Sequence, residues 1–379
     1  MRRRHLLKLT AAAGLLAGCA RPGTPIPAAN EQTEPPDAVK IGLLLPRSGP
    51  GKPVGDEIRN GFELYLARNA GQLGGQPVVT VTADEGDTAG TARAGAERLV
   101  RQERALALVG VSGPGALAAA REVAEAAHVP LIAVAAAPAA AGDRYVWRAG
   151  HVTDDPGKAL GGYLGGRADG SAYLFRSDTT EGRDAMVAFR RAFPAARIVG
   201  EEVVATGAPV NLAKLHGLGV KTLFCCLSGL GAADFVHRYR QAGLTGVAVY
   251  GTGCLTEGNA LTAGGEDALG LRTVATYAPD LRNPVNRGFA ADYAKRHGLP
   301  PTMYAAASYD AAILLDRAVA AAPIRTPEDV NAALGKLGMV DSPRGPWQFT
   351  ADHAPSQRWY LREVRKSGTT YTNALVAEL

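Results

Sequence analysis

The sequence predicts an α/β protein: two doubly wound lobes of parallel β-sheet, joined by three crossover strands, with a cleft between the lobes. Three observations predict this class. Short β-rich apolar runs alternate with stretches of helical periodicity, the alternation restarts near the middle of the chain, and the last segment adds further helices and strands. The chain of 379 residues is also too long for a single hydrophobic core.

The first half opens with a buried strand over residues 39–45, which ends at Pro46. A helix is predicted over residues 55–69, because Ile58, Phe62 and Leu66 recur at helical spacing. The same alternation predicts strands at 78–83, 105–109 and 130–135, and helices at 88–103 and 115–127. Consecutive parallel strands need a right-handed crossover, so these units form one parallel sheet covered by helices.

The second half repeats this alternation. Strands are predicted at 172–175, 197–204, 222–227 and 247–250, with helices at 182–193, 211–218 and 231–242. Helices at 284–297, 304–321 and 327–337 follow, and strands at 347–349 and 359–364 close the chain. A tail that revisits both halves implies crossing connections, and we expect lobe I at residues 38–147 and 279–343 and lobe II at 148–278 and 344–379.

The N-terminus is typical of an export signal over residues 1–18. Three arginines at positions 2–4 and Lys8 precede an apolar run at 9–17 that is too short to span a bilayer. Small residues then lead to Cys19, which resembles the lipobox of bacterial lipoproteins, whose cysteine is acylated with fatty acids such as palmitate. Residues 3–8 also resemble a twin-arginine signal, so both export routes, Sec and twin-arginine, stay open. The alternative is a chance cysteine after an ordinary signal.

Residues 19–37 are rich in Pro, Ala, Thr and Glu, which predicts a flexible, lipidated tether. The most apolar later run, 129–141, is shorter than a membrane span and contains Pro130 and Pro138. We therefore expect an exported protein, anchored through Cys19 to the outer face of the bacterial cytoplasmic membrane.

Charge and cysteine content exclude several classes. Four positive charges of the formal +5 leave with the signal, and no basic block remains, which argues against nucleic acid as a partner. Cys225 and Cys226 are adjacent and unsuited to pairing with each other, so either one bridges to Cys254 or all three are buried free thiols. No histidine stands at ligand spacing from them, so neither a metal site nor another cofactor is predicted.

Six stretches, taken in order, resemble the periplasmic binding proteins of the branched-chain amino acid (Leu/Ile/Val) class of ABC transporters, which have the type I fold. They are IGLLLPRSGPGKPVGDEIRNGFELYLARNAGQLGGQPV, ADEGDTAGTARAGAERLV, GVSGPGALAAAREVAEAAHVPLIAVAAAP, FVHRYRQAGLTGVAVYGTG, TMYAAASYDAAILLDRAV and SPRGPWQFTADHAP. The resemblance implies a monomer without enzyme activity. Such a protein binds a small polar solute between hinged lobes and presents it to ABC permease subunits.

The resemblance also implies site residues. Ser112 and Gly113 would supply a hydroxyl and backbone amides to a ligand carboxylate, although Ser112 capping its own helix is an equal alternative. Ala136 and Ala137 stand in a small-residue run, and Ala137 occupies the place of the family's carboxylate-binding threonine, without its hydroxyl.

A second departure concerns the ligand's ammonium group. Gly253 stands near the position where amino-acid-binding members of the family carry an acid that pairs with the ligand ammonium. No acid stands there in this chain, and the nearest one, Glu257, would reach that position only from a shifted loop. Since an unpaired buried charge costs several kcal/mol, these departures argue against an ordinary α-amino acid. They favour an amide, a urea-like compound, an aromatic acid or another weakly charged solute.

Further cleft candidates follow other predicted strands or begin the returning helix. They are Ser48, Asp178, Thr180, Glu181, Ser228 and Tyr304. Asp178 or Glu181 would meet a cationic group, but an acid in the first turn of a helix also serves as a cap or interacts with the helix dipole. Tyr304 would stack on the ligand or belong to the core.

Rival classes lack their signatures. Ser112 sits in a GVSGP run that falls short of a nucleophile elbow, and Gly251-Thr252-Gly253 lacks the third glycine of a dinucleotide motif. The remaining alternative is a tethered sensory protein that uses the same hinge to report its ligand to a membrane receptor.

Overall fold

The computed structural model describes residues 37–379 apart from 140–141, 168–169 and 206–207. The predicted signal peptide, nearly all of the predicted tether and Cys19 lie outside the described residues. Among the helices that are described, none combines the length and the apolar character needed to cross a membrane.

The first sheet carries the N-terminal α/β units. Its strands are β1 (Val39–Leu45), β2 (Gln72–Leu73), β3 (Gln76–Asp84), β4 (Ala107–Gly110), β5 (Leu131–Ala133) and β7 (Val146–Arg148), in the order β2-β3-β1-β4-β5-β7. All neighbours are parallel except the β2–β3 pair. The parallel pairings place the carboxyl ends of β1, β3 and β4 at one edge.

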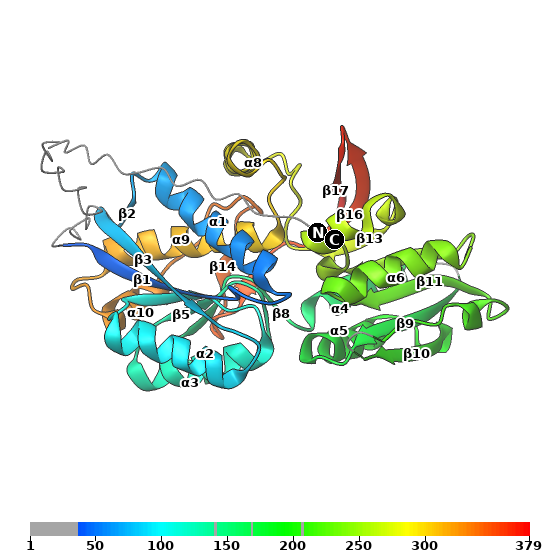
Figure 1. Ribbon diagram of the computed structural model, residues 1–379, viewed down its shortest axis with the longest axis horizontal. Helices are drawn as coiled ribbons and strands as arrows, with labels where there is room; N and C mark the ends of the chain where they lie inside the picture. Colours follow the sequence, from blue (N-terminus) through cyan, green and yellow to red (C-terminus); the bar gives the residue numbers. More distant parts are fainter. Residues whose placement is uncertain (1–36, 140–141, 168–169, 206–207) are drawn as a thin grey trace, which may run out of the picture. The chain divides into compact units, whose positions relative to one another are not determined.

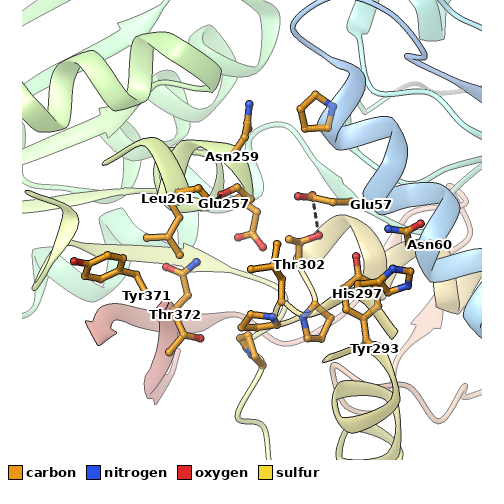
Figure 2. A pocket seen from close by; sticks show the side chains of 18 of the residues that line it. Glu57, Asn60, Glu257, Asn259, Leu261, Tyr293, His297, Thr302, Tyr371 and Thr372 are labelled. Atoms are coloured by element: carbon orange, nitrogen blue, oxygen red, sulfur yellow. Dashed lines mark hydrogen bonds between the residues drawn. The ribbon is translucent and has the colours of Figure 1, made fainter. Parts of the chain in front are cut away.

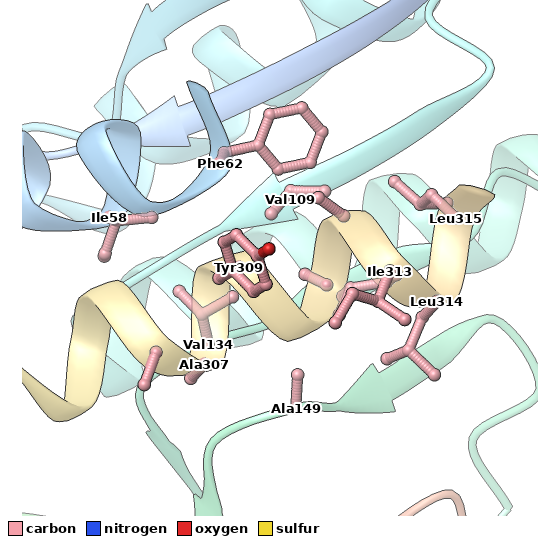
Figure 3. Packing of buried hydrophobic residues seen from close by; sticks show 14 of the residues in the cluster. Ile58, Phe62, Val109, Val134, Ala149, Ala307, Tyr309, Ile313, Leu314 and Leu315 are labelled. Atoms are coloured by element: carbon pink, nitrogen blue, oxygen red, sulfur yellow. The ribbon is translucent and has the colours of Figure 1, made fainter. Parts of the chain in front are cut away.

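Helices cover both faces of this sheet (Figure 1). One face carries α1 (Lys52–Arg68) and α9 (Met303–Ala321), and the other carries α2 (Ala89–Glu97), the following π-helical turn η1 (Arg98–Gln102) and α3 (Pro114–Ala127). Two more helices, α8 (Pro284–His297) and α10 (Pro327–Leu334), accompany α9. Figure 3 shows Ile58 and Phe62 of α1 on the side of α9 that carries Tyr309, all within one buried cluster.

The second sheet mixes parallel and antiparallel strands. It contains β9 (Ser171–Ser177), β10 (Ile198–Val204), β11 (Val220–Cys226), β12 (Ala248–Thr252), β13 (Arg272–Ala275), β16 (Tyr360–Ser367) and β17 (Thr370–Glu378), in the order β10-β9-β11-β12-β13-β16-β17. The first five are parallel, whereas β16 and β17 are antiparallel to their neighbours. The C-terminal hairpin thus closes one side of this sheet.

Two separate hydrophobic clusters lie on the faces of the second sheet. On one face α4 (Asp155–Gly165) and α5 (Thr180–Ala192) pack through Leu160 and Phe189, and on the other α6 (Gly229–Gln241) and α7 (Asn259–Gly264) pack through Phe235 and Ala260. The α4–α5 contact is backbone against backbone: a Cβ on Gly157 would lie 1.8 Å from the Ala185 carbonyl oxygen. Glycine is therefore required in α4 for this packing.

Short elements complete the chain. They are the strand pairs β6 (Ala136–Ala137) with β8 (His151–Val152) and β14 (Gln348–Phe349) with β15 (Pro355–Ser356), and the 3₁₀ turns η2 (Ala195–Arg197), η3 (Ala213–Leu215), η4 (Gly253–Thr256) and η5 (Gly265–Ala268). The chain passes between the sheets after β7, after β13 and before β16. The predicted class, α/β with parallel sheets in two lobes, is confirmed.

A buried ionic network joins two of these passages to α9. The Arg344 guanidinium lies 2.7 Å from the Asp310 carboxylate, and neither side chain is exposed by more than 2%. Ser342 and the Trp347 indole also donate to this carboxylate, and Arg344 donates to the carbonyl oxygen of Gly150. Burial raises the pKa of Asp310, while its donors oppose that change. Such a network holds both connections against α9, since breaking a buried pair is costly.

Some local predictions differ from the structure. The predicted helix at 211–218 is only the 3₁₀ turn η3, because Gly217 and Gly219 adopt φ of +87° and +63°, which end any helix there. The strands β7, β13 and β17 and the glycine-rich helix α4 were not predicted. Cys225, Cys226 and Cys254 are free and buried. Of the two alternatives, a disulfide to Cys254 and three buried free thiols, the structure therefore shows the free thiols.

Candidate functional site

A cavity of about 300 Å³, which we call the inner cavity, is lined by residues that follow strands of both sheets. Its walls are Pro50, Gly51, Val54, Glu57, Ser112, Pro114, Ala136, Thr153, Thr179, Glu181, Ser228, Gly229, Cys254, Glu257, Asn259 and Tyr304. Ligands of open α/β sheets bind beyond the carboxyl ends of the strands, where this cavity lies. It is therefore the candidate site.

Figure 2 shows residues that line a second cavity, the outer cavity, which has a volume of about 520 Å³. It is lined from α1, α7, α8, the loop 299–302 and β17. Glu57, Glu257 and Asn259 line both cavities. Glu57 comes from a helix on the first sheet and the other two from the loop after β12, so the shared wall is built from both lobes.

The Ser112 loop already holds a carboxylate of the chain itself. Ser112 follows β4, and its hydroxyl and backbone N–H donate to Glu85 over 2.6 and 2.9 Å. The Gly113 backbone N–H also faces Glu85, which is 98% buried. Burial raises the pKa of Glu85 and these donors oppose the rise. The donors that the resemblance implied for a ligand carboxylate are thus already engaged.

Glu181 is the carboxylate of the inner cavity with the weakest protein contacts. It stands in the first turn of α5, where the Cys254 thiol donates to its Oε1 over 3.6 Å and His151 Nε2 lies 3.8 Å away. Burial raises the pKa of the Cys254 thiol well above its usual range, so the thiol keeps its proton and stays a donor. The Tyr304 hydroxyl lies 3.4 Å from the same sulfur. Because these contacts are long, Glu181 retains acceptor capacity for a ligand.

Glu257 has its charge matched within the protein. Its Oε2 lies 2.7 Å from Arg362 Nη2, with both side chains almost fully buried, and its Oε1 accepts the backbone N–H of Met303 over 2.7 Å. Arg362 also donates to the Tyr277 carbonyl oxygen and the Thr273 hydroxyl. Glu257 does line the cavity. Its charge is already matched by Arg362, however, and is not free for a ligand ammonium.

Glu57 faces Glu257 with much weaker support. It accepts one hydrogen bond, from the Thr302 hydroxyl over 2.9 Å, drawn as the dashed line in Figure 2. Burial, followed by the nearby charge of Glu257, raises the pKa of Glu57 to about 8. At neutral pH this carboxyl is therefore mostly protonated and acts as a neutral donor and acceptor.

The structure brings five of the predicted site residues to the inner cavity: Ser112, Ala136, Glu181, Ser228 and Tyr304. Gly113 stands beside Ser112 as the N-cap residue of α3. Ala137 is fully buried in the core beneath α3 and does not line the cavity. Gly253 is also buried, and a Cβ there would lie 2.9 Å from the Met303 sulfur.

Three other predicted residues lie away from the inner cavity. The Ser48 hydroxyl donates to Asp84 over 2.8 Å in the loop after β1. Asp178 has a side chain 65% exposed and lies 3.7 Å from Arg176. Thr180 begins α5, where its hydroxyl accepts from Arg183.

Several lining residues were not predicted as site residues, above all Glu57, Thr153, Thr179 and Asn259, and Glu257 was considered only as an acid that a shifted loop would bring in. Thr179 caps α5 by accepting the Gly182 N–H, and a threonine directly before a predicted helix is a signal that was available. Glu57 lies inside α1, and nothing local distinguishes it from a surface acid. Among the described residues no group of His, Cys, Asp and Glu has the geometry to hold a metal ion.

Two α/β lobes with a cavity at the carboxyl ends of their strands define a two-lobed binding protein. The chain belongs to the periplasmic binding protein family, whose model matches residues 38–369. Members of this family are periplasmic binding proteins and not enzymes, and the family implies an extracytoplasmic location.

Named relatives agree with this assignment. The chain is 28% identical over 360 residues to a Leu/Ile/Val-binding protein homologue of Brucella melitensis, covering 89% of this chain and 91% of that one. A solute-binding protein of an ABC transporter from R. palustris, solved in complex with benzoate, is 29% identical with a TM-score of 0.79, covering 90% and 98%. A branched-chain amino acid transporter binding protein of Streptococcus pneumoniae, bound to isoleucine, shares the fold at 21% identity and a TM-score of 0.80, covering 89% and 99%.

Proposed function

We propose that this protein is a lipid-anchored, extracytoplasmic solute-binding protein that delivers a small polar solute to an ABC permease by hinge closure. Family membership and the two-lobed fold support the transport role. The lobes would comprise residues 38–147 with 279–343 and residues 148–278 with 344–379, and their closure would bury the solute in the inner cavity.

The observation that carries the ligand class is the charge around the inner cavity. Glu181 presents an acceptor there, no lysine or arginine lines the cavity in the described part of the chain, and Glu85 occupies the Ser112 donors. A ligand carboxylate would meet these carboxylates without a cation to match it. The solute therefore presents N–H donors, as an amide, a urea-like compound or an amine does, in contrast to the benzoate bound by the R. palustris relative.

The ligand class is tested by isothermal calorimetry on the soluble chain from residue 37, with amides, ureas, amines, benzoate and branched-chain amino acids. We expect binding by the N–H donors, and a loss of at least about tenfold in affinity for amines in Glu181→Gln, because a charge-assisted hydrogen bond is weakened. Asp178→Asn, an acid outside the cavity, is the matched control. Tight binding of benzoate or isoleucine instead would overturn the ligand class while leaving the transport role intact.

Hinge closure is tested separately by small-angle X-ray scattering with and without saturating ligand. Closure predicts a smaller radius of gyration in the complex. An unchanged radius at saturation would contradict it. The anchor is tested by mass spectrometry of the exported protein, where Cys19→Ala should abolish both the acyl mass and membrane retention.

A further inference from the structure

We infer that the outer cavity is a second compartment of the binding site, which receives an uncharged, apolar part of the solute whose polar head lies in the inner cavity. This inference rests on the proposed solute-binding function. It assigns a role to a cavity that is larger than the inner one and that contains none of the site residues predicted from the sequence.

The same three residues line both cavities, which shows that the two cavities are adjacent. Glu57 comes from α1, while Glu257 and Asn259 come from the loop and helix after β12. Figure 2 shows the Glu57 and Glu257 side chains approaching from opposite sides of the outer cavity. A solute that touches these side chains from the inner cavity therefore needs only a short extension to enter the outer one.

The walls of the outer cavity favour an apolar occupant. Four prolines, two leucines and two tyrosines contribute to the lining: Pro53, Pro279, Pro300, Pro301, Leu261, Leu299, Tyr293 and Tyr371. Ligand compartments are typically apolar with a few polar groups that fix orientation. At about 520 Å³ the volume is ample for a substituted aromatic ring or a short alkyl chain.

The acids of the outer cavity add little charge. Glu257 is neutralised by Arg362, and Asp56 is paired with Lys52 and Arg59. Burial raises the pKa of Glu57 to about 8, so this group is mostly neutral at pH 7. No lysine or arginine lines the outer cavity within the described residues. A charged extension, whether anionic or cationic, would lose hydration without gaining an unpaired counter-ion.

A ring nitrogen of His297 in the lining has neither a hydrogen bond nor an ion pair among the described residues. His297 Nε2 is buried and has no hydrogen bond among the described residues, while its ring lies 4.5 Å from that of Tyr293. Burial lowers the pKa of His297, which keeps the ring neutral. A buried nitrogen of this kind is usually satisfied, so it offers one hydrogen bond to a polar substituent on the extension.

The test uses two series of probes with a constant head: acetamide, butyramide and 3-phenylpropionamide, and the matching ethyl-, butyl- and 3-phenylpropylamines. Calorimetry should give at least about tenfold tighter binding for the phenylpropyl member than for the butyl member, because the ring buries apolar surface. Thr262→Trp, an exposed position on the wall of the outer cavity, should remove this gain and leave the butyl affinities unchanged.

Two further variants guard against trivial outcomes. Leu299→Asp places a charge in the same cavity from its exposed loop and should weaken only the phenylpropyl probes, whereas Leu230→Trp, which is 72% exposed and lines neither cavity, should change nothing. Short probes that bind as tightly as long ones, or a Thr262→Trp that weakens both equally, would overturn the outer compartment but not the proposed function. Failure of every amide and amine overturns both this inference and the proposed ligand class.

Discussion

Glu57 and Glu257 offer a direct comparison, because two carboxylates line the same pair of cavities from opposite lobes yet differ in their partners. Glu257 has a buried guanidinium at 2.7 Å and a backbone N–H, whereas Glu57 has one hydroxyl and the repulsion of Glu257. Burial, followed by the charge of Glu257, raises the pKa of Glu57 to about 8, and the single Thr302 hydrogen bond opposes this rise only in part. The two carboxylates thus differ in how far the protein compensates their burial, with a buried cation for Glu257 and a single hydroxyl for Glu57.

The largest effect is expected from removing Arg362, the cation that neutralises Glu257. Arg362→Met leaves the Glu257 carboxylate buried without its cation, which should cost about 3–5 kcal/mol of unfolding free energy. Urea unfolding measures this value, and Arg362→Met combined with Glu257→Gln should recover much of the loss. A single-variant loss below about 1 kcal/mol would mean that water or another group neutralises Glu257.

The raised pKa of Glu57 predicts that the unfolding free energy depends on pH. The folded protein retains the Glu57 proton up to about pH 8, while the unfolded chain releases it near 4.5. The associated stability is therefore fully present below pH 4.5 and is lost as the pH rises through 8. Relative to Glu57→Gln, wild type should lose roughly 2–4 kcal/mol between pH 4.5 and pH 9, less than the full shift implies because the side chain keeps some solvent contact. Parallel urea-unfolding profiles for the two proteins would contradict a raised pKa.

A smaller effect is expected from a substitution at Gly258, where the chain closely approaches Glu57. Gly258 has φ +52°, and a Cβ there would lie 2.3 Å from Glu57 Oε1. Gly265 has φ +51° with open space around it, so Gly265→Ala shows the backbone cost alone. Gly258→Ala should be destabilising by about 1–2 kcal/mol more than Gly265→Ala, because the Glu57 carboxyl must move. Equal losses in thermal unfolding would show that Glu57 yields freely.

The smallest change in unfolding free energy is expected for Asp178. Its side chain is 65% exposed and 3.7 Å from Arg176, which is a surface ion pair. Asp178→Asn should change the unfolding free energy by less than about 0.5 kcal/mol. A loss above 1 kcal/mol in urea unfolding would indicate a role beyond this pair.

The fold was largely predictable because its strands are apolar and its helices periodic. The strand at 39–45 was placed without error, and the helix at 115–127 to within one residue. The helix α4 was missed because its glycines, which have low helix propensity, hide the periodicity. Those glycines serve the close α4–α5 contact at Gly157, a tertiary reason that no local pattern carries. The hairpin β16–β17 was recognised only in part, because its second strand, β17, was not predicted.

The candidate site was predictable where it depends on strand ends. Ser112, Glu181 and Ser228 follow predicted strands, and parallel topology alone brings such positions together. The partners were not predictable, because Glu85 reaches Ser112 across 27 residues and Arg362 reaches Glu257 across more than a hundred. Which carboxylate is neutralised follows from the folded arrangement and not from the spacing of acids in the sequence.

The proton on Glu57 gives binding a thermal signature. A cationic solute that settles beside this carboxyl favours its ionised form and drives the proton into the buffer, whereas an uncharged amide leaves it in place. The measured heat of binding would then include the buffer's own heat of protonation for an amine but not for an amide. The slope of the observed enthalpy against buffer ionisation enthalpy thus counts protons released, and it reports on the charge of the natural solute.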